Sequence, residues 1–198
     1  SPRGMTFIYA NFNYDYLIFN KMLDRNNKKY LLNPTNVVKS NFSDGIYFPF
    51  VVEFFQDKLK SNVVRVNGYK NTEGKVIIPF PISYDIDQEE IKFLKNNTSI
   101  DYIILSKIDY LENIDKNNLT ALNKKRLYSA KAGAISFLKI LDIENNQVLI
   151  EMTCTADINI NENIDMDSGI RELQPITIHK DSYALGEKAM KKLLKKIK

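Results

Sequence analysis

The sequence has little of the chemistry on which many enzymes depend. Its 198 residues include no tryptophan, one cysteine (Cys154) and one histidine (His179). A single cysteine excludes a disulfide within the chain. A single histidine excludes a metal site built from several histidines. The seven glycines are scattered and form no glycine-rich phosphate loop, which excludes the common nucleotide-binding motifs.

Long apolar runs and a strong net charge are also missing. No stretch approaches the roughly 20 apolar residues that cross a bilayer as a helix. The net charge of +4 is modest, and much of the excess lies in the last few residues, so it does not form a field for nucleic acid. Hydrophobic residues make up 44% and charged residues 26%, as in ordinary globular proteins. We expect a single α/β domain over residues 6–198.

The clearest elements lie in the second half of the chain. Residues 101–108 form a nearly continuous apolar run, which is typical of a central strand covered on both faces. Two arms, 132–141 and 147–160, flank a turn at residues 144–146 and predict a long hairpin. In the second arm apolar and polar residues alternate, which predicts one buried face. The residues expected on that face are Val148, Ile150, Met152, Cys154, Ala156 and Ile158.

Three helices are predicted. Pro49 in a first turn begins one that runs to about Lys60. Asp85 or Asp87 caps a second, and Asp181 or Ser182 caps the last, at about 183–197, which has an apolar stripe and many lysines. Shorter strands are expected at 6–12, 29–32 and 63–66, with a short extended piece at 76–78, whereas residues 14–23 fit either a strand or a helix. The predicted fold class is therefore α/β (α+β), with an open mixed β-sheet flanked by helices, a long hairpin in the C-terminal half and a closing amphipathic helix.

No residue is assigned to a catalytic, cofactor or metal site. We expect His179, just ahead of the last helix, to be a surface or hinge residue, and Cys154 to act as a small buried hydrophobe. Asp165 and Asp167 resemble half of a calcium loop or the aspartate pair of a phosphatase. The calcium pattern lacks its later glutamate, and the phosphatase pair should directly follow a buried strand. A solvated turn is the interpretation we favour, and no cofactor is predicted.

Two surface features fit either binding or ordinary packing. The lysines of the last helix could attract an anionic surface, although such a run is usually the solvated face of a helix. The start of the chain is rich in aromatic residues, which could form a partner-binding surface or simply pack in a core. These aromatic residues are Phe7, Tyr9, Phe12, Tyr14, Tyr16 and Phe19.

Three segments, in this order, resemble those of a known family. They are the strand at 101–106, the hairpin at 138–149 and the closing helix at 185–194. The sequence is similar there to the group of bacterial envelope lipoproteins that includes the curli-secretion lipoprotein CsgG, the penicillin-binding-protein activator LpoB and the N-terminal domain of TolB. Ser106 and Asn146 stand where this family usually has glycine. Asparagine tolerates the left-handed backbone that such a turn requires.

The resemblance implies an envelope location and a non-enzymatic role. The expected function is binding of an envelope partner protein in assembly or secretion, with a homo-oligomer as a further possibility and no nucleic acid as partner. Two alternatives stay open. One is a hydrolase that uses Asp165 and Asp167 with a divalent metal ion. The other is a cytoplasmic module that binds nucleic acid through its terminal lysines.

The residues before Thr6 also fit two interpretations. Ser1–Gly4 could be a tag remnant ahead of a native Met5, which would indicate a cytoplasmic protein. They could instead be a tether that follows the lipid-carrying cysteine of a lipoprotein. With the resemblance, we expect a periplasmic protein anchored to the outer membrane by lipid, with no other membrane contact.

Overall fold

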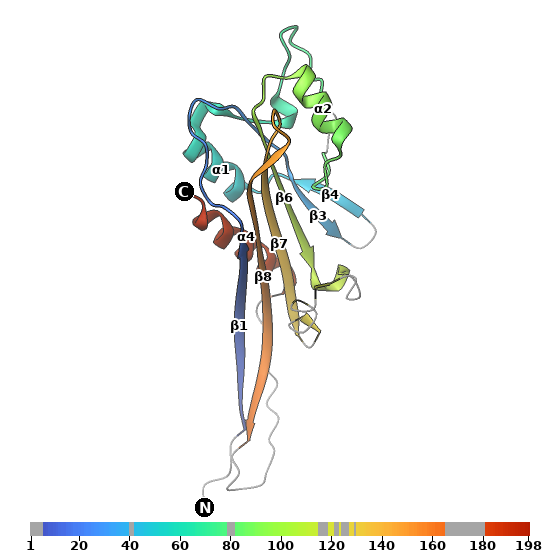
Figure 1. Ribbon diagram of the computed structural model, residues 1–198. Helices are drawn as coiled ribbons and strands as arrows, with labels where there is room; N and C mark the ends of the chain where they lie inside the picture. Colours follow the sequence, from blue (N-terminus) through green and yellow to red (C-terminus); the bar gives the residue numbers. More distant parts are fainter. Residues whose placement is uncertain are drawn as a thin grey trace, which may run out of the picture.

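An eight-stranded mixed sheet forms the centre of the structure, a computed structural model (Figure 1). The structure describes residues 6–39, 42–78, 82–114, 119–120, 123, 127–128, 130–164 and 181–198. The strands are β1 (Thr6–Ile18), β2 (Tyr30–Leu32), β3 (Thr35–Lys39), β4 (Phe42–Ile46), β5 (Val63–Arg65), β6 (Tyr102–Tyr110), β7 (Ala132–Asp142) and β8 (Gln147–Ile164). The helices are α1 (Pro49–Leu59), α2 (Gln88–Asn97) and α4 (Ser182–Lys196), with short 3₁₀ helices at Lys60–Asn62, Val66–Gly68 and Leu111–Asn113.

The sheet has an antiparallel part and a parallel part. Its strand order is β1-β8-β7-β6-β2-β5, in which β1, β8, β7 and β6 are antiparallel and β2 is parallel to both β6 and β5. The β3–β4 hairpin joins β6 further along the same edge. The open mixed sheet predicted from the sequence is confirmed. Strand β6 lies at its centre and is buried on both faces, as its apolar run predicts.

Helices α1 and α4 cover one face of the sheet, which we call the α4 face. The apolar stripe of α4 is buried there against β6, β7 and β8. Gly186 allows the close approach, because a Cβ atom at this position would lie 2.6 Å from Cγ2 of Ile108 and 3.3 Å from Cβ of Ala134. The Ser136 hydroxyl donates to the Gly186 carbonyl at 2.8 Å. These contacts fix the position of α4 across the sheet.

Helix α2 and the segment before it cover part of the other face, which we call the α2 face. Two buried asparagines that follow β2 hold that segment. The side-chain amide of Asn33 donates to the carbonyl of Ile82 at 2.7 Å, and the side-chain oxygen of Asn36 accepts from the amide of Tyr84 at 2.6 Å. A second apolar core forms here between Ile103 and Leu105 of β6 and the inner side of α2.

The capping alternatives left open by the sequence are now decided. The Asp87 carboxylate accepts from the Glu90 amide at 2.7 Å and begins α2. The Asp181 carboxylate accepts from the Ala184 amide at 2.8 Å and begins α4. Aspartate is among the best N-cap residues because its short carboxylate reaches an otherwise unpaired amide of the first turn. Of the alternatives, Asp87 rather than Asp85 caps α2, and Asp181 rather than Ser182 caps α4.

The hairpin of β7 and β8 forms as predicted, except for a bulge and for the exposure of one residue. Asn146 in its turn has φ +50°, the left-handed conformation expected of it. A bulge between Ile140 and Leu141 shifts the register. Val148 therefore lies opposite Leu141 and is 39% exposed, so its predicted place on the buried face is wrong. From Ile150 to Ile158 the alternation holds on the α4 face, as predicted.

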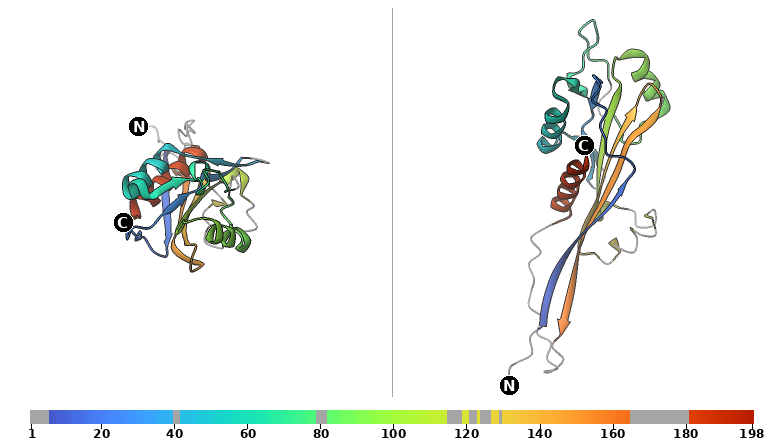
Figure 2. Two further views of the ribbon diagram at one scale, coloured as in Figure 1. Left: turned by 90° about the horizontal axis from the view of Figure 1, so that it is seen from above. Right: turned by 60° about the vertical axis from the view of Figure 1, so that its left-hand side comes forward.

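Three other elements differ from expectation. Strand β1 continues to Ile18, which decides that the start of the 14–23 segment is a strand. The extended piece expected at 76–78 is not a strand. The β3–β4 hairpin is a further difference, because the sequence predicts no strand between the one at 29–32 and the helix that begins at Pro49. Beyond the start of β7, β1 and β8 continue as a two-stranded ribbon, in which Thr6 lies opposite Ile164 (Figures 1 and 2).

Candidate functional site

One edge of the sheet is formed by β1, whose 13 residues all pair with β8. Among the described strands, β8 is the only one that pairs with β1. A strand in this position presents a row of backbone donors and acceptors along its outer side. The edge is therefore a template on which another extended segment can pair.

The register shows which residues of β1 face outward. The Phe19 amide, just past the strand, donates to the Glu151 carbonyl at 2.9 Å. In an antiparallel pair, residues that bond to the partner strand alternate with residues that do not. Asn13 and Leu17, like Phe19, therefore direct their backbone toward β8. Tyr14 and Tyr16 direct their N–H and C=O groups away from β8, toward the open side.

Exposed apolar side chains gather at the end of β1. Four of them, which we call the β1 patch, are Leu17, Ile18, Phe19 and Met22, with exposed fractions of 65%, 37%, 73% and 55%. Alternation along the strand puts Leu17 and Phe19 on one side of the edge and Ile18 on the other, so apolar side chains flank the edge on both sides. The patch directly continues the open edge. This combination of apolar side chains and open backbone is typical of a surface that meets another protein.

Helix α4 places two lysines on aromatic rings of β1. The ammonium of Lys192 lies 4.6 Å from the ring centre of Tyr14, and that of Lys196 lies 4.8 Å from the ring centre of Tyr16. Four residues of helix rise about 6 Å and two residues of strand about 6.8 Å, so the two spacings match. Among the described residues, neither lysine forms a salt bridge with a carboxylate. A row of positive charge therefore follows the open edge on the α4 face.

A second charged cluster lies on the α2 face. The Lys107 ammonium lies 3.4 Å from the Asp109 carboxylate and 4.5 Å from the ring centre of Phe137. The Lys139 ammonium lies 4.2 Å from the ring centre of Tyr84. Burial raises the pKa of Asp109, opposed by Lys107, and burial lowers the pKa of Lys139. Since these groups pack against Tyr84, we interpret the cluster as part of what holds the 82–84 segment on the sheet.

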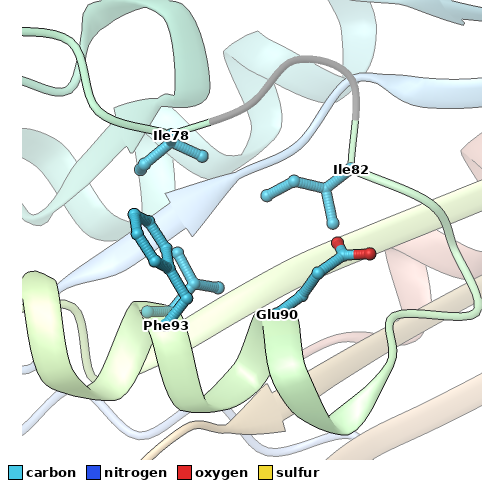
Figure 3. Close-up of a pocket in the computed structure, with 5 residues that line it drawn as sticks. Ile78, Ile82, Glu90 and Phe93 are labelled. Atoms are coloured by element: carbon cyan, nitrogen blue, oxygen red, sulfur yellow. The ribbon is translucent and has the colours of Figure 1, made fainter.

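An apolar hollow lies between α2 and the segment before it (Figure 3). It measures about 90 Å³ and is lined by Ile78, Ile82, Phe93 and Leu94 together with Glu90. Burial, followed by the nearby Asp87 carboxylate, raises the pKa of Glu90. Ligand pockets usually enclose about 300–1,000 Å³, so this hollow is too small for a cofactor. A larger hollow of about 330 Å³ beside Asp101, Asp142 and Lys95 is lined mainly by polar atoms of both charges.

The structure describes only some of the candidate residues named from the sequence. Cys154 is fully buried on the α4 face beside Met152 and Ala156, as predicted. His179, Asp165 and Asp167 lie outside the described residues, as does Ser1–Gly4. In the part of the chain that the structure describes, no group of three or more His, Cys, Asp or Glu side chains is placed to hold a metal ion. Within the same part, no helix has both the length and the apolar character of a bilayer span.

The described aromatic residues at the start of the chain differ in exposure. Tyr14 and Tyr16 are partly buried against the core, whereas Phe12 and Phe19 are exposed. Packing in the core is therefore confirmed for Tyr14 and Tyr16, whereas partner binding by the exposed residues stays a prediction. The sequence alone does not predict that lysines of α4 lie on tyrosine rings of β1. The sequence contains two lysines four residues apart and two tyrosines two residues apart. These spacings alone do not predict that the lysines contact the tyrosines.

Comparisons with known proteins do not show a family for this chain. Neither a scan against protein-family models nor a search of curated proteins finds a match. Among solved structures, the chain is similar to a variant of the PelC dodecamer from Paraburkholderia phytofirmans, with a TM-score of 0.40 and 8% identity over 93% of this chain and 98% of that chain. A second crystal form of the PelC dodecamer gives 0.37 and 8% over 73% and 81%. These values describe a distant similarity that carries no information about function.

Proposed function

We propose that this chain is a non-catalytic domain of a bacterial envelope lipoprotein and that it binds a partner protein through the surface around β1. The observation that carries the proposal is the β1 patch beside an open strand edge. Partner surfaces recognised by strand addition take affinity from backbone hydrogen bonds and specificity from flanking side chains. Both kinds of group are present here. The resemblance of the strand, hairpin and closing helix to envelope lipoproteins supports the location and the assembly or secretion role.

The binding surface is tested by photocrosslinking in cells. A photoreactive phenylalanine analogue replaces Phe19 in the full-length native protein, and a matched protein carries it at Val76, which is 53% exposed and far from β1 in sequence. We expect a defined adduct from position 19 that position 76 does not give. Phe19 is 73% exposed, so we expect Phe19→Ser to keep the fold and to release the same partner on purification. The same adducts from both positions would contradict the proposal.

The location is tested separately. The full-length native protein is labelled in cells with a clickable fatty acid and then fractionated. Label in the membrane fraction is the expected result. Unlabelled protein in the cytosol would remove the envelope part of the proposal, while the crosslinking result would still decide whether the β1 surface binds a protein.

A further inference from the structure

The β1 edge also indicates what kind of segment it receives, an inference that rests on the proposed function. We propose that the occupant is an extended segment of a partner protein that pairs with β1 as an added strand. Acidic residues at alternate positions would face Lys192 and Lys196, with an apolar residue opposite Leu17.

The backbone supplies the first part of the argument. Tyr14 and Tyr16 direct their donors and acceptors to the open side of β1, at the level where α4 crosses the sheet. An added strand satisfies these groups with its own backbone, whatever its side chains are. Helix α4 packs on β6, β7 and β8 and leaves the outer side of β1 accessible among the described elements. An extended chain therefore has both the hydrogen-bonding groups and the space that it needs.

The charges supply the second part. Lys192 and Lys196 lie on the α4 face above Tyr14 and Tyr16. The side chains of an added strand that lie on this face come at every second residue, about 6.8 Å apart. That distance is close to the spacing of the two lysines along α4, about 6 Å. Carboxylates at positions i and i+2 of the added strand would thus each meet one ammonium.

The opposite face supplies the third part. Leu17 lies on the α2 face of β1 and is 65% exposed. The residue between the two acidic positions of the added strand lies opposite Asp15, whereas the residue just beyond the position that faces Tyr16 lies opposite Leu17. An apolar side chain opposite Leu17 would be buried against it. The expected recognition pattern is therefore two acidic residues at alternate positions, with an apolar residue next to the one that faces Tyr16.

A second copy of this chain fits the edge less well. If two β1 strands paired antiparallel, their tyrosines would lie on a common face, and the lysines of both α4 helices would approach each other over it. Like charges at such a junction are unfavourable. Charge complementarity thus favours an acidic partner over self-association.

The probe is a fluorescein-labelled peptide of nine residues in which glutamate and valine alternate, and binding to the purified chain is followed by fluorescence anisotropy. A peptide of the same composition with its glutamates in one block is the sequence control. We expect the alternating peptide to bind at least tenfold more tightly than the block peptide, and more weakly as salt rises. Equal binding of the two peptides, or none, would overturn the inference.

Protein variants locate the site. Lys192→Gln combined with Lys196→Gln should weaken binding of the alternating peptide at least tenfold. Lys188→Gln combined with Lys195→Gln removes the same charge from exposed positions of α4 that do not lie on the two tyrosines, and should weaken it by twofold or less. An equal loss in both double variants would show attraction by net charge alone and would overturn the inference.

Two further peptides test strand addition itself. One carries N-methyl groups on its glutamates and the other on its valines. Only residues whose N–H points to β1 are affected, so one of the two peptides should lose binding. Loss with methylated glutamates indicates antiparallel pairing and loss with methylated valines indicates parallel pairing. Unchanged binding of both would overturn the inference.

The outcomes separate this inference from the proposed function. An adduct from position 19 together with no binding of the alternating peptide would keep β1 as a partner surface and reject an acidic strand as its occupant. Dimerisation of the chain that competes with the peptide would assign the edge to a second copy and would also reject it. Absence of the position-19 adduct would count against the proposed function itself.

Discussion

Two edge strands of the sheet, β5 and β1, are built in opposite ways. At one edge, β5 has three residues and passes directly into a 3₁₀ turn at Val66. There the Tyr47 hydroxyl accepts from the Val66 amide at 3.0 Å and donates to the Leu32 carbonyl at 2.8 Å. At the other edge, β1 runs for 13 residues and ends in exposed apolar side chains. Proteins commonly shorten or cover sheet edges to prevent unwanted pairing, so an edge left long is a candidate for intended pairing.

The largest expected effect compares two phenylalanines, one buried and one exposed. Phe55 of α1 is fully buried, and Phe19 beyond β1 is 73% exposed. Phe55→Ala should lower the free energy of unfolding by about 3–5 kcal/mol because it leaves a cavity. Phe19→Ala should change it by about 0.5 kcal/mol or less. Urea denaturation measures both values. A loss above about 1 kcal/mol from Phe19→Ala would show that Phe19 serves the fold and would weaken its assignment to a binding surface.

The next effect concerns the closed edge. Tyr47→Phe leaves the buried Val66 amide and the Leu32 carbonyl without the hydroxyl that joins them. We expect a loss of about 1–3 kcal/mol in the free energy of unfolding. Tyr14→Phe at the open edge is the matched control and should have almost no effect. If the two variants were equally stable, the hydroxyl would not be what closes the β5 edge.

Alkaline pH should remove the stabilisation that the Tyr47 hydroxyl provides. Burial raises the pKa of Tyr47 from 10.0 to about 12, because the phenolate is disfavoured in the core. The stabilisation from the neutral hydroxyl is therefore fully present below pH 10 and is lost as pH rises to about 12. The difference in stability between the wild type and Tyr47→Phe should shrink over this range. A difference that stays constant up to pH 12 would contradict the assignment.

The smallest effect is expected from the lysines over β1. Lys192→Gln and Lys196→Gln should each lower the free energy of unfolding by about 0.5 kcal/mol, the size of an exposed contact between an ammonium and an aromatic ring. Lys188→Gln should have no measurable effect. A large loss from either of the first two would indicate that these lysines hold α4 in place, and a ligand-binding role would then be harder to separate from folding.

Much of the fold could be predicted because its signals are local. The apolar run of β6, the alternation in β8 and the aspartate caps of α2 and α4 each depend on a few neighbouring residues. The exposure of Val148 could not be predicted, because the bulge that causes it depends on how β7 pairs with β8. The β3–β4 hairpin was missed for a related reason, since β3 is held partly by its contact with the distant β6.

The candidate site was less predictable than the fold. The sequence shows the aromatic start of the chain and the lysines of the last helix, but it does not predict that the two meet. Their connection requires α4 to cross the sheet at the angle that puts Lys192 over Tyr14, and this is fixed by tertiary contacts such as that of Gly186 with Ile108. The openness of β1 is likewise a property of strand order. Neither property is encoded within a short stretch of sequence.

Residue-resolved amide hydrogen exchange by NMR tests the open edge most directly. In the free protein, the amides of Asn13 and Leu17 should be protected by β8, whereas those of Tyr14 and Tyr16 should exchange rapidly. Saturation with the alternating glutamate–valine peptide should slow exchange at Tyr14 and Tyr16 and leave Asn13 and Leu17 as they were. If Tyr14 and Tyr16 are already as protected as Asn13 without any peptide, the edge of β1 is not open and the account of this surface is wrong.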